Sequence, residues 1–400
     1  MKTAEAYIDA EHTFGAHNYH PLPLVAVSAQ GVWVTDVAGG QYLDCISSYS
    51  ALNQGHSHPR IVRALTEQAG RLALTSRAFH NDVLPRFLEK LTDYTGFEVA
   101  LPMNTGAEAT ETAVKLVRRW GYRVKGIPAD KAEIIVCHRA FHGRTTAAIA
   151  MSSDEEYRRD FGPFPAGFVH VAHGDIAALA AAITPYTAGF VLEPIQGEGG
   201  VNVAPEGYLR AVAELCRQQN VLFVADEIQT GFGRTGARFA CDHEDVQADV
   251  LVVGKALGGG VYPVSAVLAS RALMSLFEPG SHGSTFGGNP LAAAVGIAAL
   301  EVIVEEKLAE KAALRGHELV TGIRNLNLPS IREVRGRGLL IGIELTLPAR
   351  SVAEALLAEG IIAKDTHETV LRLAPPLIIT AEEIALIPPA LARALSHAGG

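Results

Sequence analysis

The fold is decided by one stretch, Asp249-Val250-Leu251-Val252-Val253-Gly254-Lys255-Ala256-Leu257-Gly258-Gly259-Gly260. Its β-branched run predicts a buried strand, which delivers Lys255 to the strand's C-terminal end. The three glycines that follow let other groups approach closely. Open α/β sheets bind ligands at this edge. Because lysines usually keep their amine in solvent, the function of Lys255 depends on what other segments bring to the same edge.

A second apolar strand is predicted at residues 221–226. It ends at Asp226, which lies 29 residues before Lys255. This separation is long enough for a crossover that returns a parallel strand beside the first. Burying the Asp226 carboxylate alone would be costly, so we expect it to be paired. The two side chains are therefore predicted to meet at one edge of the sheet.

The composition is that of a compact globular protein. Its 400 residues are 48% hydrophobic and 19% charged, which predicts two domains or one large domain with a smaller satellite. No apolar run approaches the roughly twenty residues of a membrane helix. The net charge of −9 disfavours nucleic acid and anionic membranes as partners. Residues 1–5 lack an apolar signal segment and the four cysteines lack ligand or redox spacing, so we expect a cytoplasmic protein with free thiols.

Two segments rich in small residues are candidates for binding a phosphate. Gly106 and Ala107 open a predicted helix, for which Gly121 is the expected stop. The bare N–H groups and the dipole at such a helix start attract anions. A later glycine-rich loop offers the hydroxyls of Ser284 and Thr285 to a second edge of the phosphate.

Aromatic and charged side chains follow other predicted strands. Phe141 and Arg144 come after an apolar strand at residues 134–137, and they offer a ring-stacking face and a fork that fits a carboxylate. Arg372 lies between two leucines of another strand, where its charge calls for an anion. Glu198 lies in a glycine-rich loop that follows a strand.

Two local patterns imitate other kinds of site. Residues 231–236, Gly-Phe-Gly-Arg-Thr-Gly, match the dinucleotide fingerprint, but they neither follow a strand directly nor open a strong helix. The pair His56 and His58 lacks a third ligand at metal-binding spacing, and so does the group Cys137, His138 and His142. We therefore expect neither a nicotinamide cofactor nor a metal.

One cofactor explains the remaining pieces together, pyridoxal 5′-phosphate. Its aldehyde needs a lysine for a Schiff base, its pyridine nitrogen needs an acid partner, and its phosphate needs N–H donors. Lys255, Asp226 and the helix start at Gly106 offer these groups, and Phe141 offers a face for the ring. Two arginines, Arg144 and Arg372, remain to bind the carboxylates of substrates.

The same residues carry a resemblance to a known family. Over nearly its whole length the chain resembles the class III, fold type I aminotransferases, most specifically at residues 226–231 and 254–260. Within that family it is most similar to the ornithine δ-aminotransferases. That finer similarity rests on Tyr19 with the His-Pro-Leu-Pro after it, on Ser-Ser-Tyr-Ser-Ala at 47–51, on Asn-Gln-Gly-His at 53–56, on Leu-Pro-Met-Asn-Thr-Gly at 101–106 and on Leu-Arg-Leu-Ala-Pro-Pro at 371–376.

The resemblance implies a fold and a domain division. The fold is α/β, with a mostly parallel seven-stranded sheet between helices in a large domain and a smaller α+β domain. The expected parts are an N-terminal segment of residues 1–48 that joins the small domain, a cofactor-binding domain of residues 49–292 and a C-terminal small domain of residues 293–400.

The resemblance also implies a role for each candidate residue. Lys255 would hold the cofactor and move a proton, and Asp226 would pair with the ring nitrogen. The other cofactor-binding residues would be Gln229 at the ring hydroxyl, Phe141 on the ring face, and Gly106 and Ala107 at the phosphate, joined there by Ser284 and Thr285 of a second subunit. The family therefore implies a homodimer. The substrate-binding residues would be Tyr19, Tyr49, Arg144, Glu198 and Arg372.

For the substrates, the resemblance implies ornithine and 2-oxoglutarate. We hypothesise that Glu198 masks Arg372 while ornithine reacts and then releases it to bind the α-carboxylate of 2-oxoglutarate. Where many ornithine enzymes have tryptophan after the stacking phenylalanine, this chain has His142, as in the wider family. Acetylornithine or 4-aminobutyrate aminotransferase activity remains an alternative, and a class III decarboxylase or aminomutase fits the two arginines less well.

Overall fold

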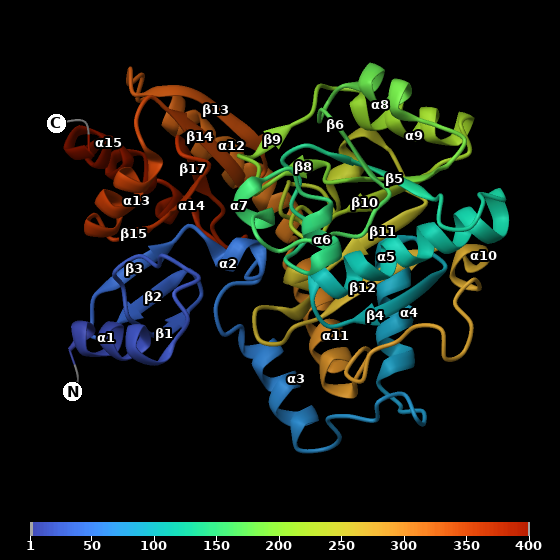
Figure 1. Ribbon diagram of the computed structural model, residues 1–400. Coiled ribbons are helices and arrows are strands. Elements are labelled where there is room, and N and C mark those ends of the chain that lie inside the picture. The colour runs from blue at the N-terminus through green and yellow to red at the C-terminus, as the bar shows by residue number, and fades with distance from the viewer. Residues whose placement is uncertain (1–2, 399–400) are drawn as a thin grey trace.

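The computed structural model describes residues 3–398 and is built around a seven-stranded sheet (Figure 1). In spatial order the strands are β4 (Val99–Met103), β12 (Ser265–Ala269), β11 (Val250–Val253), β10 (Leu222–Asp226), β7 (Thr187–Leu192), β5 (Glu133–Cys137) and β6 (Phe168–Val171). β12 is antiparallel to both neighbours, and every pairing from β11 to β6 is parallel. The predicted, mostly parallel sheet is confirmed.

Alternate residues of the strands feed two hydrophobic cores, one on each face of the sheet. On β5, Ile134 and Val136 belong to one core and Ile135 belongs to the other. Every residue of β7, β10, β11 and β12 is buried. Strands covered on both faces read as continuous apolar runs, which is why the sequence reveals them.

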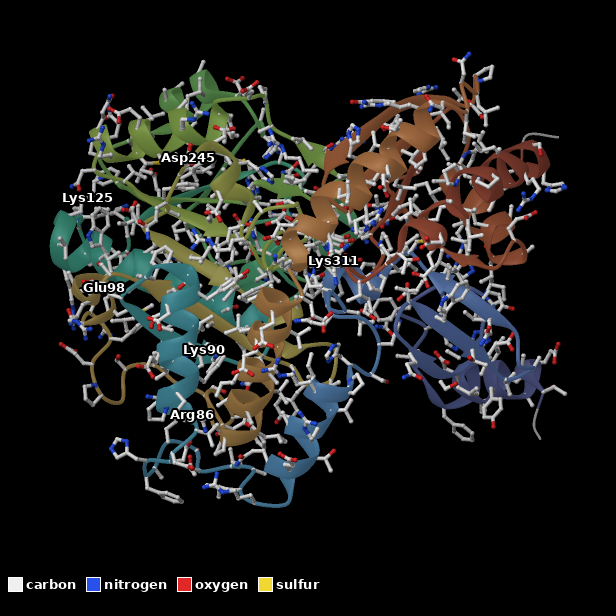
Figure 2. All side chains as sticks on the ribbon, turned by 180° about the vertical axis from the view of Figure 1, so that it is seen from behind. Arg86, Lys90, Glu98, Lys125, Asp245 and Lys311 are labelled. Carbon is white, nitrogen blue, oxygen red and sulfur yellow. The ribbon has the colours of Figure 1, made fainter. Side chains whose placement is uncertain are left out.

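Helices cover both faces (Figure 1). In this part of the chain they are α3 (Pro59–Ala69), α4 (Leu84–Thr95), α5 (Gly106–Trp120), α6 (Thr146–Ala150), α7 (Glu155–Arg158), α8 (Ile176–Ala182), α9 (Tyr208–Gln218), α10 (Arg271–Met274) and α11 (Pro290–Glu305). α4 illustrates their amphipathic pattern, because Phe87 and Leu91 are fully buried while Arg86 and Lys90 extend from the other side (Figure 2).

α5 ends at Trp120 with Gly121 as its C-cap residue, so the predicted end of this α-helix is confirmed. A π-helical turn, η1 (Gly121–Lys125), continues it, and the chain leaves the helix at Gly126 with a φ of 79°. A Cβ on Gly121 would lie 2.9 Å from the Cβ of Ala188. This glycine therefore also permits close packing on β7.

The N-terminal and C-terminal parts of the chain lie side by side (Figure 1). The C-terminal part has an antiparallel sheet of β13 (Ile331–Arg337), β14 (Leu340–Leu345), β17 (Val370–Leu373) and β16 (Lys364–Thr366), with helices α12 (Leu308–Arg324), α13 (Ala349–Ala358), α14 (Ala381–Ile384) and α15 (Ile387–Ala398). The N-terminal part has α1 (Ala4–Phe14), β1 (Ala26–Gln30), β2 (Trp33–Asp36) and β3 (Gln41–Asp44). β3 pairs in parallel with β15 (Ile361–Ile362).

The domain boundaries after residues 48 and 292 stay a prediction. α11 spans the second of them, and it packs mainly against α3 and α4. Of the helices within residues 3–398, none is both long enough and apolar enough to cross a membrane.

Candidate active site

Parallel pairing brings Asp226 and Lys255 to one edge of the sheet. Asp226 is the last residue of β10 and lies opposite Val252 of β11. Lys255 comes just after β11 and begins the short 3₁₀ helix η3 (Lys255–Gly258), with a φ of 45° that is uncommon for a residue with a Cβ. Both side chains line one cavity, as the strand spacing predicts.

This cavity has a volume of about 200 Å³. Seven of the residues predicted from the sequence line it, namely Gly106, Ala107, Phe141, Glu198, Asp226, Gln229 and Lys255. The other lining residues are His142, Gly143, Glu193, Ile195, Ile228 and Thr230. Segments that follow five different strands, together with the start of α5, thus meet at one place.

Small residues keep one wall of the cavity open. Gly106 is the first residue of α5, and a capping box between Thr105 and Glu108 fixes this helix start. A Cβ on Gly143 would lie 2.9 Å from the Cβ of Ala107. A larger side chain at Gly143 would clash with the start of α5. The N–H groups at this helix start therefore lie beside small residues only, and such a site suits a phosphate group.

The cavity also contains an unpartnered polar atom. The Oε1 atom of Gln229 is buried and has no hydrogen-bond partner, although the Nε2 atom of the same side chain donates to Glu198 Oε1 at 3.1 Å. A buried acceptor without a partner is costly unless a ligand supplies the donor. The ring hydroxyl of pyridoxal 5′-phosphate is such a donor, so this cavity fits the cofactor.

Asp226 is paired, as the sequence predicts, and its partner is His142. The Nδ1 atom of His142 lies 2.7 Å from Asp226 Oδ2, and both side chains are buried. Asp226 Oδ1 accepts a hydrogen bond from the N–H of Ile228 at 3.1 Å. Burial lowers the pKa of His142, but the hydrogen bond and charge of Asp226 outweigh it, so the net pKa lies above its usual value.

Lys255 has the electrostatic properties of an amine that can act as a base. Burial lowers its pKa to about 8, and Glu198 opposes that shift while Arg372 adds to it. A substantial fraction of such amines is neutral near physiological pH.

Glu198 forms a partly buried ion pair with Arg372. Arg372 Nη1 donates to Glu198 Oε1 at 2.7 Å, and only 3% of the arginine side chain is exposed. Burial raises the pKa of Glu198, but the charge of Arg372 outweighs it and leaves the pKa at about 2. The Nη2 atom of Arg372 is buried without a partner. The Nη1 atom of Arg372 is thus held by Glu198, and its Nη2 atom is free to donate.

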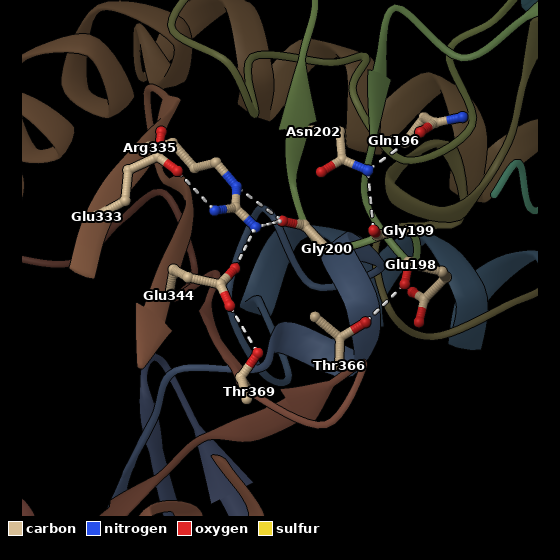
Figure 3. A network of polar contacts seen from close by, with 10 residues as sticks. All are labelled: Gln196, Glu198, Gly199, Gly200, Asn202, Glu333, Arg335, Glu344, Thr366 and Thr369. Atoms are coloured by element: carbon tan, nitrogen blue, oxygen red, sulfur yellow. Dashed lines mark hydrogen bonds and ion pairs between the residues drawn. The ribbon is translucent and has the colours of Figure 1, made fainter. Parts of the chain in front are cut away.

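The C-terminal sheet holds the loop that carries Glu198 (Figure 3). Thr366 donates to the carbonyl oxygen of Glu198 at 2.6 Å. Arg335 of β13 donates to the carbonyl of Gly200 at 2.8 Å and to Glu344 at 3.0 Å. This loop joins the short strands β8 (Ile195–Gln196) and β9 (Asn202–Val203). The position of Glu198 therefore depends on both parts of the chain.

The remaining predicted residues lie outside this cavity. Tyr49 stacks on Arg372, whose guanidinium carbon is 5.0 Å from the ring centre. The guanidinium of Arg144 lies over the ring of Tyr157, 4.2 Å from its centre. Tyr19 is 73% exposed. Ser284 and Thr285 line a separate surface hollow.

Sequence reasoning missed two cavity residues, His142 and Glu193. Glu193 is buried and accepts from the N–H of Phe141 at 2.8 Å, and burial raises its pKa to about 8 in spite of the nearby charge of His142. The position of His142 next to Phe141 was a usable signal, but its contact with Asp226 spans 84 residues and no local pattern encodes it.

The pattern that matches the dinucleotide fingerprint and the histidine pair that resembles a metal site both have structural explanations. Cβ atoms on Gly233 and Gly236 would lie 3.2 Å and 3.0 Å from atoms of α12, so these glycines let that helix approach. His56 is bonded to Asp44 and His58 to Glu306. Within residues 3–398, no group of three or more histidine, cysteine or acidic side chains is placed to hold a metal ion.

Comparison with known families agrees with this geometry. The family model described as aminotransferase class III matches residues 14–395. The chain belongs to the class III aminotransferases. Members of this family use pyridoxal 5′-phosphate, and the cavity of this aminotransferase has a lysine, a buried carboxylate and a glycine-lined helix start that fit it.

Three relatives place this aminotransferase more narrowly. An ornithine aminotransferase from Bacillus cereus (strain 03BB102) is 58% identical over 377 residues, which are 94% of this chain and 95% of the relative. The structure of an ornithine aminotransferase from Toxoplasma gondii, with partial occupancy of PLP at its active site, is 43% identical, covers 100% of this chain and 95% of its own, and has a TM-score of 0.98. An acetylornithine aminotransferase from Elizabethkingia anophelis is 48% identical, covers 99% of this chain and 100% of its own, and has a TM-score of 0.90.

Proposed function

We propose that this aminotransferase moves the δ-amino group of L-ornithine to 2-oxoglutarate, with pyridoxal 5′-phosphate as its cofactor. The products would be glutamate and glutamate 5-semialdehyde, which cyclises to pyrroline-5-carboxylate. The two substrates would use one cavity in turn, in a ping-pong sequence. The observation that carries this proposal is the partly buried ion pair of Glu198 and Arg372 beside Lys255.

The residues that would hold the cofactor are those that line the cavity. When bound, the cofactor supplies an aldehyde that captures an amine and a ring that withdraws electrons from the reacting carbon. Lys255 would hold the aldehyde end and, once displaced by substrate, would take and return a proton. Asp226 would accept from the ring nitrogen, and Gln229 would accept from the ring hydroxyl. The remaining contacts come from Phe141 on the ring face and from the N–H groups at Gly106 and Ala107.

Arg144, Tyr49 and Tyr19 would bind the amino-acid end of ornithine. Arg144 is exposed but held over the ring of Tyr157, which leaves its donors available for a carboxylate. The pKa of Tyr49 is raised by burial and, further, by the charges of Glu198 and of Tyr19, which lies within electrostatic reach. The two hydroxyls suit a free α-amino group, so the δ-amine would point toward Lys255.

The ion pair solves the problem of accepting two unlike substrates. Ornithine places an uncharged methylene chain near the reacting carbon, and 2-oxoglutarate places a carboxylate there. While Glu198 holds Arg372, the cavity has no free cation at that point. When Glu198 swings away, Arg372 can bind the α-carboxylate of 2-oxoglutarate, and Arg144 can bind its other carboxylate.

We further propose that the enzyme works as a homodimer in the cytoplasm. Ser284 and Thr285 do not line the cavity of their own chain, and Thr285 is exposed. Ser284 accepts from Asn104 at 2.9 Å, just before α5 begins. A second subunit that places these hydroxyls at the phosphate would complete the site.

Glu198→Gln tests the masking role. The variant should react with ornithine about 10-fold or more slowly, because the buried Arg372 guanidinium then lacks a charged hydrogen-bond partner worth ~1.5–3 kcal/mol. Its half-reaction with 2-oxoglutarate should be retained. Single-turnover absorbance changes of the bound cofactor measure the two half-reactions separately.

Glu359→Gln is the matched control, because it breaks a contact of the same length, 2.7 Å, with Arg393 outside the cavity. Both half-reactions should stay within about 3-fold of wild type in this control. The masking role is wrong if Glu198→Gln leaves the ornithine half-reaction unchanged and weakens only the 2-oxoglutarate one.

Acetylornithine is the second candidate substrate, favoured by the 48% identity with the Elizabethkingia anophelis enzyme. A reagent that traps the cyclised aldehyde separates the two, since an acetylated α-amine cannot cyclise. A trapped product from ornithine, with slower turnover of acetylornithine, supports the proposal. The reverse preference would overturn it.

A further inference from the structure

Tyr157 connects two side chains of the candidate site. The guanidinium carbon of Arg144 lies 4.2 Å from the centre of the Tyr157 ring, within the range of a cation–π contact. The Tyr157 ring also meets the ring of Phe141 edge to face, with 5.9 Å between their centres. Arg144 itself lies 5.6 Å from the centre of the Phe141 ring. The three side chains therefore form one cluster, which begins at the cavity wall that Phe141 lines.

The short helix that carries Tyr157 is attached to its surroundings by the next residue, Arg158. α7 packs beside α6 (Figure 1). Arg158 Nη1 donates to three backbone carbonyls at the end of α6 and just after it, those of Ile149 at 3.2 Å, Ala150 at 3.2 Å and Ser152 at 3.1 Å. These contacts fix the backbone next to Tyr157, so its ring has a set position without any ligand.

Arg144 depends on this ring more than on other groups. It is exposed, and in the described part of the chain its guanidinium contacts two aromatic rings and pairs with no carboxylate. A flexible arginine loses rotamer entropy when it binds a carboxylate, and a contact that orders the side chain beforehand reduces this cost. A ring stacked on the flat face of a guanidinium leaves its in-plane N–H groups free to donate.

The charges around Tyr157 suit this role. Burial raises the pKa of its phenol, while the charge of Arg144 opposes this shift and that of Glu198 adds to it. Tyr157 therefore keeps its proton at neutral pH, and Arg144 meets a neutral ring. The effect of Glu198 also means that Tyr157 lies within electrostatic reach of the ion pair between Glu198 and Arg372.

We infer that Tyr157 is a positioning residue, whose ring holds the Arg144 guanidinium beside Phe141 so that it can bind a carboxylate of each substrate. This inference rests on the proposed function, in which Arg144 binds the amino-acid end of ornithine and one carboxylate of 2-oxoglutarate. Without the ring, each carboxylate would have to immobilise a mobile arginine. Because this cost falls on the bound substrate and the transition state alike, KM rises and kcat changes little.

The test is a double-mutant cycle. Tyr157→Leu removes the ring, Tyr157→Phe keeps the ring without its hydroxyl, and Arg144→Met removes the charge. Tyr157→Leu is also combined with Arg144→Met, which shows whether the tyrosine acts through the arginine. KM and kcat are measured for ornithine and for 2-oxoglutarate with the cofactor bound. Phe168→Leu is the control, because it removes a ring that lies 5.1 Å from the Arg118 guanidinium, outside the cavity.

In Tyr157→Leu, KM for both substrates should rise about 5-fold, which is within the range of a cation–π contact. The kcat of this variant, and both constants of Tyr157→Phe and Phe168→Leu, should stay within about 2-fold of wild type. In the Arg144→Met background, Tyr157→Leu should change kcat/KM by less than about 2-fold. A purely structural defect would lower kcat/KM to the same degree in both backgrounds, which would overturn the inference.

The other outcomes are also decisive. If Tyr157→Phe is as impaired as Tyr157→Leu, the hydroxyl and not the ring is responsible, and the inference is wrong. Should Tyr157→Leu not fold, Tyr157→Met gives the same comparison, since it also lacks the ring. If wild type transfers the amino group of ornithine but the cycle shows no coupling, the role of Tyr157 is wrong while the proposed function stands. If wild type does not accept ornithine at all, the proposed function itself fails.

Discussion

The active-site lysine is predicted to destabilise the protein when the cofactor is absent. Burial lowers the pKa of Lys255 from 10.5 to about 8, with Glu198 as the main opposing influence. At roughly 1.4 kcal/mol per pH unit, this difference corresponds to about 3 kcal/mol of lost stability for the protonated side chain. Replacement by methionine keeps most of the volume and removes the charge. We therefore expect cofactor-free Lys255→Met to be more stable than wild type near pH 7.

The dependence on pH follows from the sign of the pKa shift. Below pH 8 both the folded and the unfolded protein keep the proton on Lys255, so the full difference of about 3 kcal/mol applies. Between pH 8 and 10.5 the folded state loses its proton first, and the unfolded state binds more protons. Wild-type stability then rises relative to the variant, and the advantage of Lys255→Met should vanish near pH 10.5.

Thermal unfolding of both proteins at pH 7 and pH 10, followed by intrinsic fluorescence, measures this difference. Comparison at the same pH removes the contribution of all other titrating groups. Lys131→Met is the control, because Lys131 is exposed and its replacement should change stability by less than about 0.5 kcal/mol. An equal or lower melting temperature for Lys255→Met at pH 7 would refute the reasoning. An advantage that persists unchanged at pH 10 would assign the effect to packing instead of charge.

Two other substitutions probe buried charges. Arg234 is completely buried and donates to Asn53 Oδ1 at 2.6 Å and to the carbonyls of Leu339 at 2.9 Å and Pro375 at 2.6 Å. Arg234→Met should lower the unfolding free energy by ~3–5 kcal/mol, because three buried acceptors lose their donor, and urea titration would show it. Glu198→Gln should remove the part of wild-type stability that is present above pH 4.5 and lost as the pH falls toward 2. An acid titration that is the same in both proteins would contradict this.

The central sheet was predictable because its strands are buried on both faces. Their apolar runs leave a plain signal, and the 29 residues between Asp226 and Lys255 limit how the two strands can connect. The π-helical turn that follows α5 was not predictable. Gly121 packs closely on Ala188, 67 residues away, and the local sequence does not contain that contact.

The candidate site also contains some residues that could be selected from the sequence and others that could not. Groups whose chemistry is unusual for their position, such as a lysine at a strand end or Arg372 between leucines, can be selected from sequence alone. Glu193 could not, because a glutamate near a strand end is ordinary, and the position of His142 next to Phe141 did not reveal its contact with Asp226. They gain their properties from burial beside Asp226, which only the assembled sheet creates.

Tyr49 shows most clearly how tertiary contacts override local preference. It belongs to α2 (Ser47–Ser50), in which four consecutive residues other than glycine have positive φ values between 46° and 71°. Each such residue costs roughly 1–2 kcal/mol, so no local rule predicts this left-handed turn. Asp44 Oδ1 accepts from the N–H of Ser47 at 3.0 Å, and Ser47 Oγ donates to the carbonyl of Ala374 at 2.5 Å.

These contacts tie the strained turn to the strand that carries Arg372. Ala374 immediately follows β17, so the turn and the arginine share one anchor. Tyr49 consequently lies on Arg372 at 5.0 Å, and its carbonyl accepts from Gln229 at 3.4 Å. A relaxed loop would leave the tyrosine free to adopt many rotamers. The strain is therefore best understood as the means by which the fold holds Tyr49, which is proposed to bind substrate, beside the ion pair of Glu198 and Arg372.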